Sequence, residues 1–214
     1  MIKNQSITVS VLMAIFNTPF ELAKRAIDSV LNQDFQNFEM IILDDGSEEL
    51  LGRKLFQYSL LHPLKITYVR HPNCGQSESI NRGVKIARGE YITIIDSDDE
   101  YKPNHLTACI NGIGDSDLIS SLAEIIVNKE EDYFVPDKDD HSKSIHVDDC
   151  ILFATLFGRN EVFRQLSFKS MYAADNEFYE KAQSLFKVKK IDLRTYVYYR
   201  NRMCSITGKL KRDQ

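Results

Sequence analysis

The sequence predicts an α/β fold in which a mostly parallel sheet lies between two layers of helices. Apolar, β-branched segments alternate with segments of helical periodicity through the first half of the 214-residue chain, which is the pattern of parallel strands joined by crossover helices. Two of the apolar segments end directly in aspartates, and ligands of open parallel sheets bind at the carboxyl ends of strands. At this length we expect one domain, residues 1–214.

The first half contains four expected strands and three expected helices. The strands cover residues 7–15, 38–43, 65–69 and 90–95. The first helix begins near residue 18, and the other two cover residues 48–61 and 76–88. Thr18 and Glu21 form a capping box with Pro19 at the first helical position. Ser47 is expected to cap the second helix, and Gly89 to follow the third as its C′ residue.

The second half breaks this alternation. We expect strands over residues 118–127, 151–157, 188–191 and 195–199, and a helix over residues 174–186. Residues 128–150 carry eight acids against three lysines, which indicates a mobile loop, whereas residues 187–212 carry nine basic residues and one acid. The basic segment favours an anionic partner near the carboxyl end.

The composition excludes several classes of protein. A net charge of −4 argues against a nucleic-acid binder, and no apolar run is long enough to span a bilayer. The amino terminus lacks the apolar core of a secretory signal. The four cysteines and five histidines show no zinc or disulfide spacing, so we expect reduced thiols, surface histidines and a cytoplasmic protein.

Three groups of carboxylates are the candidate functional residues. They are Asp44 and Asp45, then Asp96, Asp98 and Asp99, and finally Asp175. Oxygen ligands suit a hard cation such as Mg²⁺ or Mn²⁺ that also holds a phosphate. Each group also fits an ordinary turn or helix cap. An EF-hand is excluded because Tyr101 and Thr107 stand where it needs Gly and Glu, and the chain has no glycine-rich phosphate loop ending in Gly-Lys-Ser/Thr.

Several motifs resemble those of family 2 glycosyltransferases, which have the GT-A fold. In order they are VSVLMAIFN (9–17), SVLNQ (29–33), ILDDGS (42–47), GQS (75–77), NRG (81–83), ARGEYI (87–92) and DSDD (96–99). The resemblance is strong to about residue 105 and fainter afterwards. It implies a Rossmann-like GT-A domain with a nucleotide-sugar-binding half, residues 1–105, and a smaller acceptor-side half, residues 106–214.

The resemblance also assigns roles on the donor side. Ala14, Phe16 and Asn17 would line the nucleotide base. A carboxylate of the Asp44-Asp45 turn would accept a hydrogen bond from the base imide, which favours a uridine diphosphate sugar. The remaining donor-side residues by resemblance are Asn81, Asp96 and Ser97 for the nucleotide sugar, Asp98 for a Mg²⁺ or Mn²⁺ ion on the diphosphate, Asp99 beside the sugar or metal, and Arg200 for the diphosphate.

Asp175 matches the aspartate of the family's Glu-Asp motif and would be the base that accepts a proton from the acceptor hydroxyl, with inversion at the sugar. A helix amino terminus would keep this carboxylate ionised, although a plain helix cap explains the same residue. The chain departs from the family pattern at Ile80, Ala174 and Arg202, where a basic residue, Glu and His are usual.

The sequence thus predicts a metal-dependent, inverting glycosyltransferase for glycan or polysaccharide synthesis. Its partners would be a nucleoside-diphosphate sugar and a glycan or lipid-linked acceptor, with peripheral membrane contact through the basic carboxyl-terminal segment. Two alternatives stay open, a non-catalytic nucleotide-sugar binding module and a nucleotidyltransferase. The second would be expected to carry a glycine- and arginine-rich loop after the first strand, where this chain has Phe16, Asn17, Thr18 and Pro19.

Overall fold

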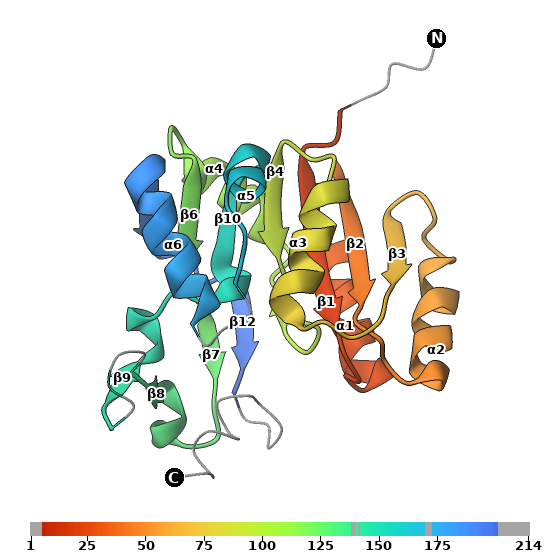
Figure 1. Cartoon of the computed structure of the whole chain (residues 1–214), viewed down its shortest axis with the longest axis horizontal. Coiled ribbons are helices and arrows are strands. Elements are labelled where there is room, and N and C mark those ends of the chain that lie inside the picture. Colours follow the sequence, from red (N-terminus) through yellow and green to blue (C-terminus); the bar gives the residue numbers. More distant parts are fainter. Residues whose placement is uncertain (1–5, 138–139, 141, 170–172, 201–214) are drawn as a thin grey trace.

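The structure is a computed structural model that describes residues 6–137, 140, 142–169 and 173–200. A seven-stranded sheet lies at its centre in the order β11-β6-β10-β4-β1-β2-β3 (Figure 1). The strands are β1 (Val9–Ile15), β2 (Phe38–Asp44), β3 (Ile66–Arg70), β4 (Tyr91–Ile94), β6 (Leu118–Ser121), β10 (Leu156–Arg159) and β11 (Val188–Ile191). The predicted α/β class is confirmed.

The half of the sheet built by the first hundred residues is entirely parallel. β1 pairs with β2 and β4, and β2 pairs with β3, all in parallel register. β10 runs antiparallel to both β4 and β6, and β11 runs parallel to β6. The carboxyl ends of β1, β2, β3 and β4 therefore meet at a single edge of the sheet.

Helices cover both faces of the sheet (Figure 1). They are α1 (Phe20–Leu31), α2 (Glu49–Ser59), α3 (Gln76–Ile86), α4 (His105–Ile113), α5 (Asn160–Gln165) and α6 (Ala174–Leu185). Alternate residues of β1 serve opposite faces, since Val11 and Met13 belong to the core cluster that includes residues of α1 and α4, whereas Leu12 belongs to the cluster that includes residues of α3, α5 and α6. This two-sided burial explains why β1 is apolar apart from Ser10, whose hydroxyl donates to Glu39 Oε1 at 2.8 Å.

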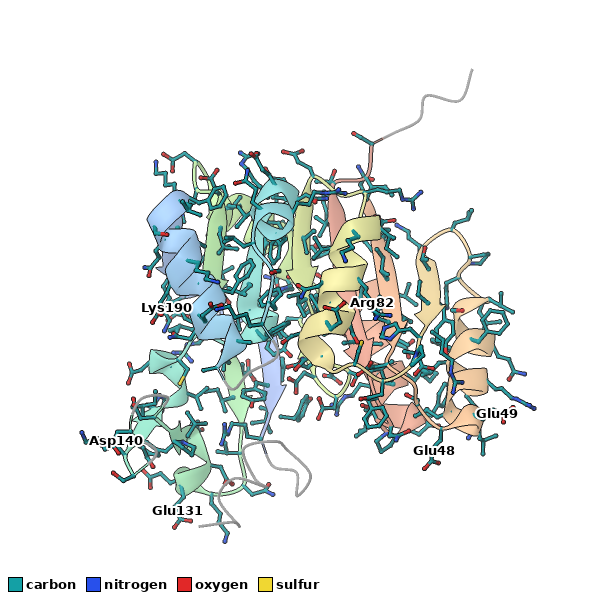
Figure 2. All side chains as sticks on the ribbon, in the orientation of Figure 1. Glu48, Glu49, Arg82, Glu131, Asp140 and Lys190 are labelled. Carbon is teal, nitrogen blue, oxygen red and sulfur yellow. The ribbon has the colours of Figure 1, made fainter. Side chains whose placement is uncertain are left out.

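Two small sheets and three 3-10 turns complete the fold beyond the carboxyl edge. β5 (Glu100–Tyr101), β12 (Tyr196–Tyr199) and β7 (Glu124–Ile126) form one sheet, and β8 (Phe134–Pro136) pairs with β9 (Ser144–His146). Short 3-10 turns are η1 (Glu130–Tyr133), η2 (Val147–Asp149) and η3 (Phe153–Thr155). Lys190, labelled in Figure 2, donates from Nζ to the carbonyl oxygens of Asp148 at 2.6 Å and Cys150 at 2.9 Å, so β11 holds this region against the main sheet.

The structure corrects three predicted segments in the second half and adds one helix that the sequence analysis missed. Residues 118–127 form two strands in different sheets, and the acidic segment 128–150 contains a hairpin and two 3-10 turns where we expected a loop. The strand expected over residues 151–157 is β10, which begins only at Leu156. Sequence reasoning also missed α4, although Leu106, Cys109 and Ile113 have the helical spacing of a buried stripe.

The predicted helix ends are also corrected. No side chain caps α1 or α2. The Thr18 hydroxyl lies 2.6 Å from that of Ser97, and the Ser47 hydroxyl accepts from Asn17 N at 3.1 Å. α3 ends at Ile86, before Gly89, and Gly89 instead lets the chain pass close to Ser10, where a Cβ atom would lie 2.4 Å from Ser10 N.

Two histidines expected at the surface are buried. His105 is 1% exposed and its Nδ1 lies 2.8 Å from Thr195 Oγ1. Burial lowers the pKa of His105 to about 3, so this imidazole is neutral. His71 is also buried, directly after β3. Among the helices of the described residues, none is both long enough and apolar enough to cross a bilayer.

Candidate functional site

The candidate site lies at the edge of the sheet where the parallel strands end. Ile15 pairs with Asp44 in the β1–β2 ladder, and Ile95 N donates to Leu12 O at 3.0 Å. The aspartates after β2 and β4 therefore share this edge, as predicted. α6 brings Asp175 to the same region. Its negative charge is one of the causes that raise the pKa of Asp96, which indicates that the two carboxylates are near each other.

The end of β1 combines an exposed ring with a constrained turn. Ala14 is partly buried against the core on the α3 face, whereas Phe16 is 52% exposed. Asn17 has a φ of 53°, a left-handed conformation that Asn tolerates better than most residues. Its Oδ1 accepts from Glu48 N at 2.8 Å, which fixes the end of β1 to the start of α2. Phe16 thus offers a flat apolar surface beside this turn.

Asp44 holds the turn between β2 and α2. Its carboxylate is fully buried, with Oδ1 accepting from Ser47 N at 2.8 Å and Oδ2 accepting from the Tyr68 hydroxyl. Arg70 Nε lies 3.8 Å from Oδ2. Burial and this carboxylate raise the pKa of Tyr68, so the phenol keeps its proton and remains the donor. Both oxygens of Asp44 therefore have partners within the protein.

Asp45 connects the end of β2 to the loop before α3. Oδ1 accepts from Cys74 N at 2.7 Å, and Oδ2 accepts from Gly75 N at 2.9 Å and from Asn73 Nδ2 at 3.1 Å. Gly75 has a φ of 89°, which glycine adopts without steric cost. Cys74 Sγ, a weak donor at 3.4 Å, is the second partner of Oδ1, so a ligand that binds Asp45 would displace the thiol.

Asp96 and Asp98 are the partly exposed acids after β4. Burial, followed by the negative charge of Asp98, raises the pKa of Asp96 to about 7, although a 2.7 Å hydrogen bond from Gln76 Nε2 acts in the opposite direction. Arg25 donates to the backbone oxygen of Asp98. The two carboxylates are thus held close together against their mutual repulsion.

Asp99 and Ser97, from the same motif, serve the fold. Asp99 is 1% exposed, and its carboxylate accepts from the Tyr196 hydroxyl at 2.6 Å and from Tyr199 N at 2.9 Å. Burial and the charges of Asp96 and Asp98 raise the pKa of Asp99 well above its ordinary value. The Ser97 hydroxyl forms a hydrogen bond with the Thr18 hydroxyl, next to the start of α1. Asp99 and Ser97 therefore anchor the turn that presents Asp96 and Asp98.

Asp175 lies in the first turn of α6, as predicted. Its Oδ1 accepts from Asn176 N at 2.8 Å and its Oδ2 from Phe153 N at 3.1 Å. These backbone bonds favour the carboxylate, but burial is the larger effect and raises the pKa of Asp175. The helix amino terminus thus supplies the expected bond from Asn176 N, while burial has the larger effect on the pKa.

A cavity of about 300 Å³ joins Asp175 to Arg200. Cys150, Ile151, Asn176 and Tyr198 also line it. The Arg200 guanidinium lies 5.7 Å from the centre of the Tyr198 ring and donates to Phe134 O at 3.3 Å. Arg202 and the rest of the expected late motif lie outside the described residues. The cavity therefore brings two predicted site residues together between α6, η2, the β8–β9 hairpin and β12.

Asn81 has a structural use that the sequence did not indicate. Its Nδ2 donates to Phe168 O at 2.8 Å, and its Oδ1 accepts from Phe168 N at 3.0 Å. The side chain thereby fastens the segment after α5 to α3.

A second group of potential ligands contains Asp45, His71 and Cys74, whose donor atoms lie within 4.8 Å of one another. Sequence reasoning missed this group because Asp45 is distant along the chain. The His-x-x-Cys spacing of residues 71–74 was the one available signal.

The family model of glycosyl transferase family 2 matches residues 10–188. Because this match covers most of the chain, the protein belongs to glycosyl transferase family 2, and the resemblance read from its motifs is confirmed. Its α/β architecture is the GT-A fold.

Two curated bacterial proteins illustrate the sequence relationship. The chain is 45% identical over 101 residues to the putative colanic acid biosynthesis glycosyl transferase WcaA of Escherichia coli, a match that covers 46% of this chain and 35% of WcaA. It is 29% identical over 126 residues to the glycosyltransferase GlyG of Streptococcus pneumoniae, covering 58% of this chain and 40% of GlyG. The match thus spans well under half the length of either relative.

Solved structures support the fold at lower identity. TarS of S. aureus, residues 1–349 in complex with UDP-GlcNAc, superposes with a TM-score of 0.74 at 18% identity over 94% of this chain and 60% of that chain. The mannosyltransferase PcManGT of Pyrobaculum calidifontis, in complex with GDP-Man and Mn²⁺, gives a TM-score of 0.70 at 17% identity over 88% and 56%.

Proposed function

We propose that this chain transfers a sugar from a nucleoside-diphosphate sugar to an acceptor hydroxyl in glycan or polysaccharide synthesis. The proposal depends mainly on the meeting of Asp96, Asp98 and Asp175 at the strand edge, where burial and neighbouring negative charges raise the pKa of Asp96 to about 7. Carboxylates held together against their own repulsion are stabilised when a cation binds between them. The similarity to WcaA, a putative colanic acid biosynthesis glycosyl transferase, supports the same general reaction.

The end of β1 and the β2–α2 turn would bind the nucleotide base. Phe16 offers an exposed ring, and a base imide would replace the weak Cys74 Sγ donor at Asp45 Oδ1. Asp44 would act indirectly, because both of its oxygens hold the turn. A uridine diphosphate sugar is the donor we favour, and the binding of UDP-GlcNAc by TarS supports this choice.

Asp98, with Asp96 beside it, would hold a Mg²⁺ or Mn²⁺ ion. Their oxygen donors and partial exposure fit a hard divalent cation, and PcManGT, of similar fold, is a complex with Mn²⁺. When bound, the ion would act as a Lewis acid on the departing diphosphate. Arg200 would add positive charge for the diphosphate from the edge of the cavity that contains Asp175.

Asp175 would accept the proton of the attacking hydroxyl, with inversion at the sugar. Two backbone N–H groups orient its carboxylate, and the upward pKa shift makes it a stronger base than an exposed aspartate. The cavity between Asp175 and Arg200 would receive the glycan or lipid-linked acceptor. Membrane contact through residues 187–212 stays a prediction for liposome flotation, since residues 201–212 lie outside the described structure.

A thermal-shift screen of UDP, GDP, CDP and dTDP, with and without Mn²⁺, tests this proposal. We expect UDP with Mn²⁺ to raise the Tm by several degrees, because about 2.7 kcal/mol is gained when a ligand is present at 100 times its Kd. Asp98→Asn should lose the metal-dependent part of the shift. Asp115→Asn is the matched control, since this 80% exposed acid precedes β6 at the opposite edge of the sheet.

Release of UDP from UDP-sugars by the wild-type chain completes the test. Nucleotide binding without any release or transfer would favour the binding-module alternative, for which Ala174 in place of the usual Glu is the specific argument. Absence of a shift with every nucleotide, with and without metal, would contradict the donor site altogether.

A further inference from the structure

Asp45, His71 and Cys74 form a closed triangle of potential metal ligands on the base side of the sheet edge. Asp45 Oδ1 lies 3.4 Å from Cys74 Sγ and 3.5 Å from His71 Nδ1, and Sγ lies 3.6 Å from Nδ1. The residues come from the end of β2 and from the loop between β3 and α3. The same three atoms thus contact one another pairwise.

These distances match one face of a zinc tetrahedron. Zinc binds cysteine sulfur at about 2.3 Å, histidine nitrogen at about 2.0–2.1 Å and carboxylate oxygen at about 2.0–2.2 Å. Tetrahedral angles then separate sulfur from nitrogen by about 3.5 Å, sulfur from oxygen by about 3.5 Å, and nitrogen from oxygen by about 3.3 Å. The observed edges of 3.6, 3.4 and 3.5 Å need shifts of only a few tenths of an ångström.

The ligands are held in place by the surrounding backbone. The Asp45 carboxylate accepts from Cys74 N and Gly75 N, and His71 N donates to Asp44 O at 3.0 Å. Such outer contacts orient metal ligands before a metal arrives. Asp45 and His71 are buried, whereas Cys74 is partly exposed, which leaves a side from which solvent can supply a fourth ligand.

The contacts of His71 within the protein do not account for its burial. Nδ1 lies 3.0 Å from Pro72 O, and Nε2 is buried without a hydrogen-bond partner in the described chain. The unpartnered atom is Nε2, whereas Nδ1 is the atom that faces Cys74 Sγ and Asp45 Oδ1, so the ligand geometry comes from Nδ1 alone. Burial raises the pKa of the Cys74 thiol, and the positive charge of Arg82 acts in the opposite direction. Arg82, labelled on α3 in Figure 2, is paired with Glu78 at 3.4 Å.

We propose that Asp45, His71 and Cys74 form a three-ligand site for Zn²⁺, with water as the fourth ligand. Thiolate and imidazole favour zinc over Mg²⁺, so this site would differ in metal preference from the carboxylates at Asp98. On binding, the Cys74 thiol releases its proton to solvent, and the imidazole proton that faces Pro72 O moves from Nδ1 to Nε2, so that Nδ1 offers its lone pair. If the proposed function holds, zinc competes with the nucleotide base for Asp45.

Metal titration of the whole chain tests the site without any sugar donor. Zn²⁺ is measured by competition with a chromogenic chelator, and Co²⁺ by the absorption of a thiolate–cobalt bond. We expect one zinc ion for the wild type. Cys74→Ser and His71→Asn should each weaken binding by more than the roughly 10- to 100-fold that loss of an outer-shell contact costs, and Cys74→Ser should abolish the cobalt–thiolate band.

Cys150→Ser is the matched control, because it removes a partly exposed thiol elsewhere in the fold, and it should bind zinc like the wild type. The proposal is overturned if the wild type binds no zinc, or if Cys74→Ser and His71→Asn retain wild-type affinity. Neither result bears on the proposed sugar transfer, which is measured with Mn²⁺ and UDP.

Discussion

Asp96 and Asp99 come from one short motif, yet their surroundings give them different tasks. Asp99 is buried and accepts from Tyr196 and from the backbone of Tyr199. Asp96 is partly exposed and close enough to Asp98 and Asp175 for their charges to raise its pKa. The motif therefore supplies both an anchor for the turn, Asp99, and a candidate metal ligand, Asp96.

Replacement of Asp175 tests the base. We expect Asp175→Asn to reduce sugar transfer by about 10²- to 10⁴-fold, because a positioned general base contributes that much, while the thermal shift with UDP and Mn²⁺ is retained. Turnover and Tm measured on the same preparations check this. Glu177→Gln is the control on the same helix turn, since Glu177 pairs with Lys169 and Lys181 away from the cavity. Equal transfer by the wild type and Asp175→Asn would leave this residue as a helix cap.

Among the elements, β12 joins the acidic turn to the acceptor side. Tyr196 donates to Asp99, and its hydroxyl also accepts from Asp96 N at 3.4 Å. The same strand pairs with β5, directly after the motif, and with β7. One late strand thereby fixes the position of carboxylates encoded a hundred residues earlier.

Tyr196→Phe tests this connection. The variant leaves a buried oxygen of Asp99 without its donor, which we expect to lower the free energy of unfolding by about 1–3 kcal/mol. Tyr179→Phe is the control, because the Tyr179 hydroxyl has no hydrogen-bond partner in the described residues. Denaturant unfolding of both variants measures the difference, and equal stability would mean that the Asp99 bond has little weight.

For the molecule as a whole, the acidic edge makes stability depend on pH. Folding raises the pKa of Asp96 from 3.8 to about 7. The folded state therefore holds a proton that the unfolded state releases, and the contribution of Asp96 to the free energy of unfolding falls as pH rises between those values. Without metal, Asp96→Asn should thus gain Tm relative to the wild type at about pH 8, and less at about pH 5.

Thermal unfolding of both proteins in the presence of a chelator measures this effect. Asp115→Asn serves as the control, because Lys187 lowers the pKa of that exposed acid and its effect has the opposite sign. A Tm difference between Asp96→Asn and the wild type that does not change with pH would contradict the raised pKa.

The sequence by itself determined the parallel half of the fold and the family. Residues 9–15 are apolar apart from Ser10, and two other mainly apolar segments lead to Asp44 and to Asp96. Such strands have few alternatives to a parallel sheet with a polar carboxyl edge. Local patterns were sufficient there because each strand and its following helix are adjacent in the chain. The family model confirms the family, and the residues it matches include these same motifs.

Only the tertiary structure decided what each polar side chain binds. Thr18 and Ser47 match helix caps in sequence, but partners from distant segments, Ser97 and Asn17, use their hydroxyls instead. The burial that raises the pKa of Asp175, and the meeting of Asp45 with His71 and Cys74, likewise come from chain segments packed together by the fold. Such contacts depend on distances in space, which periodicity and spacing along the chain do not contain.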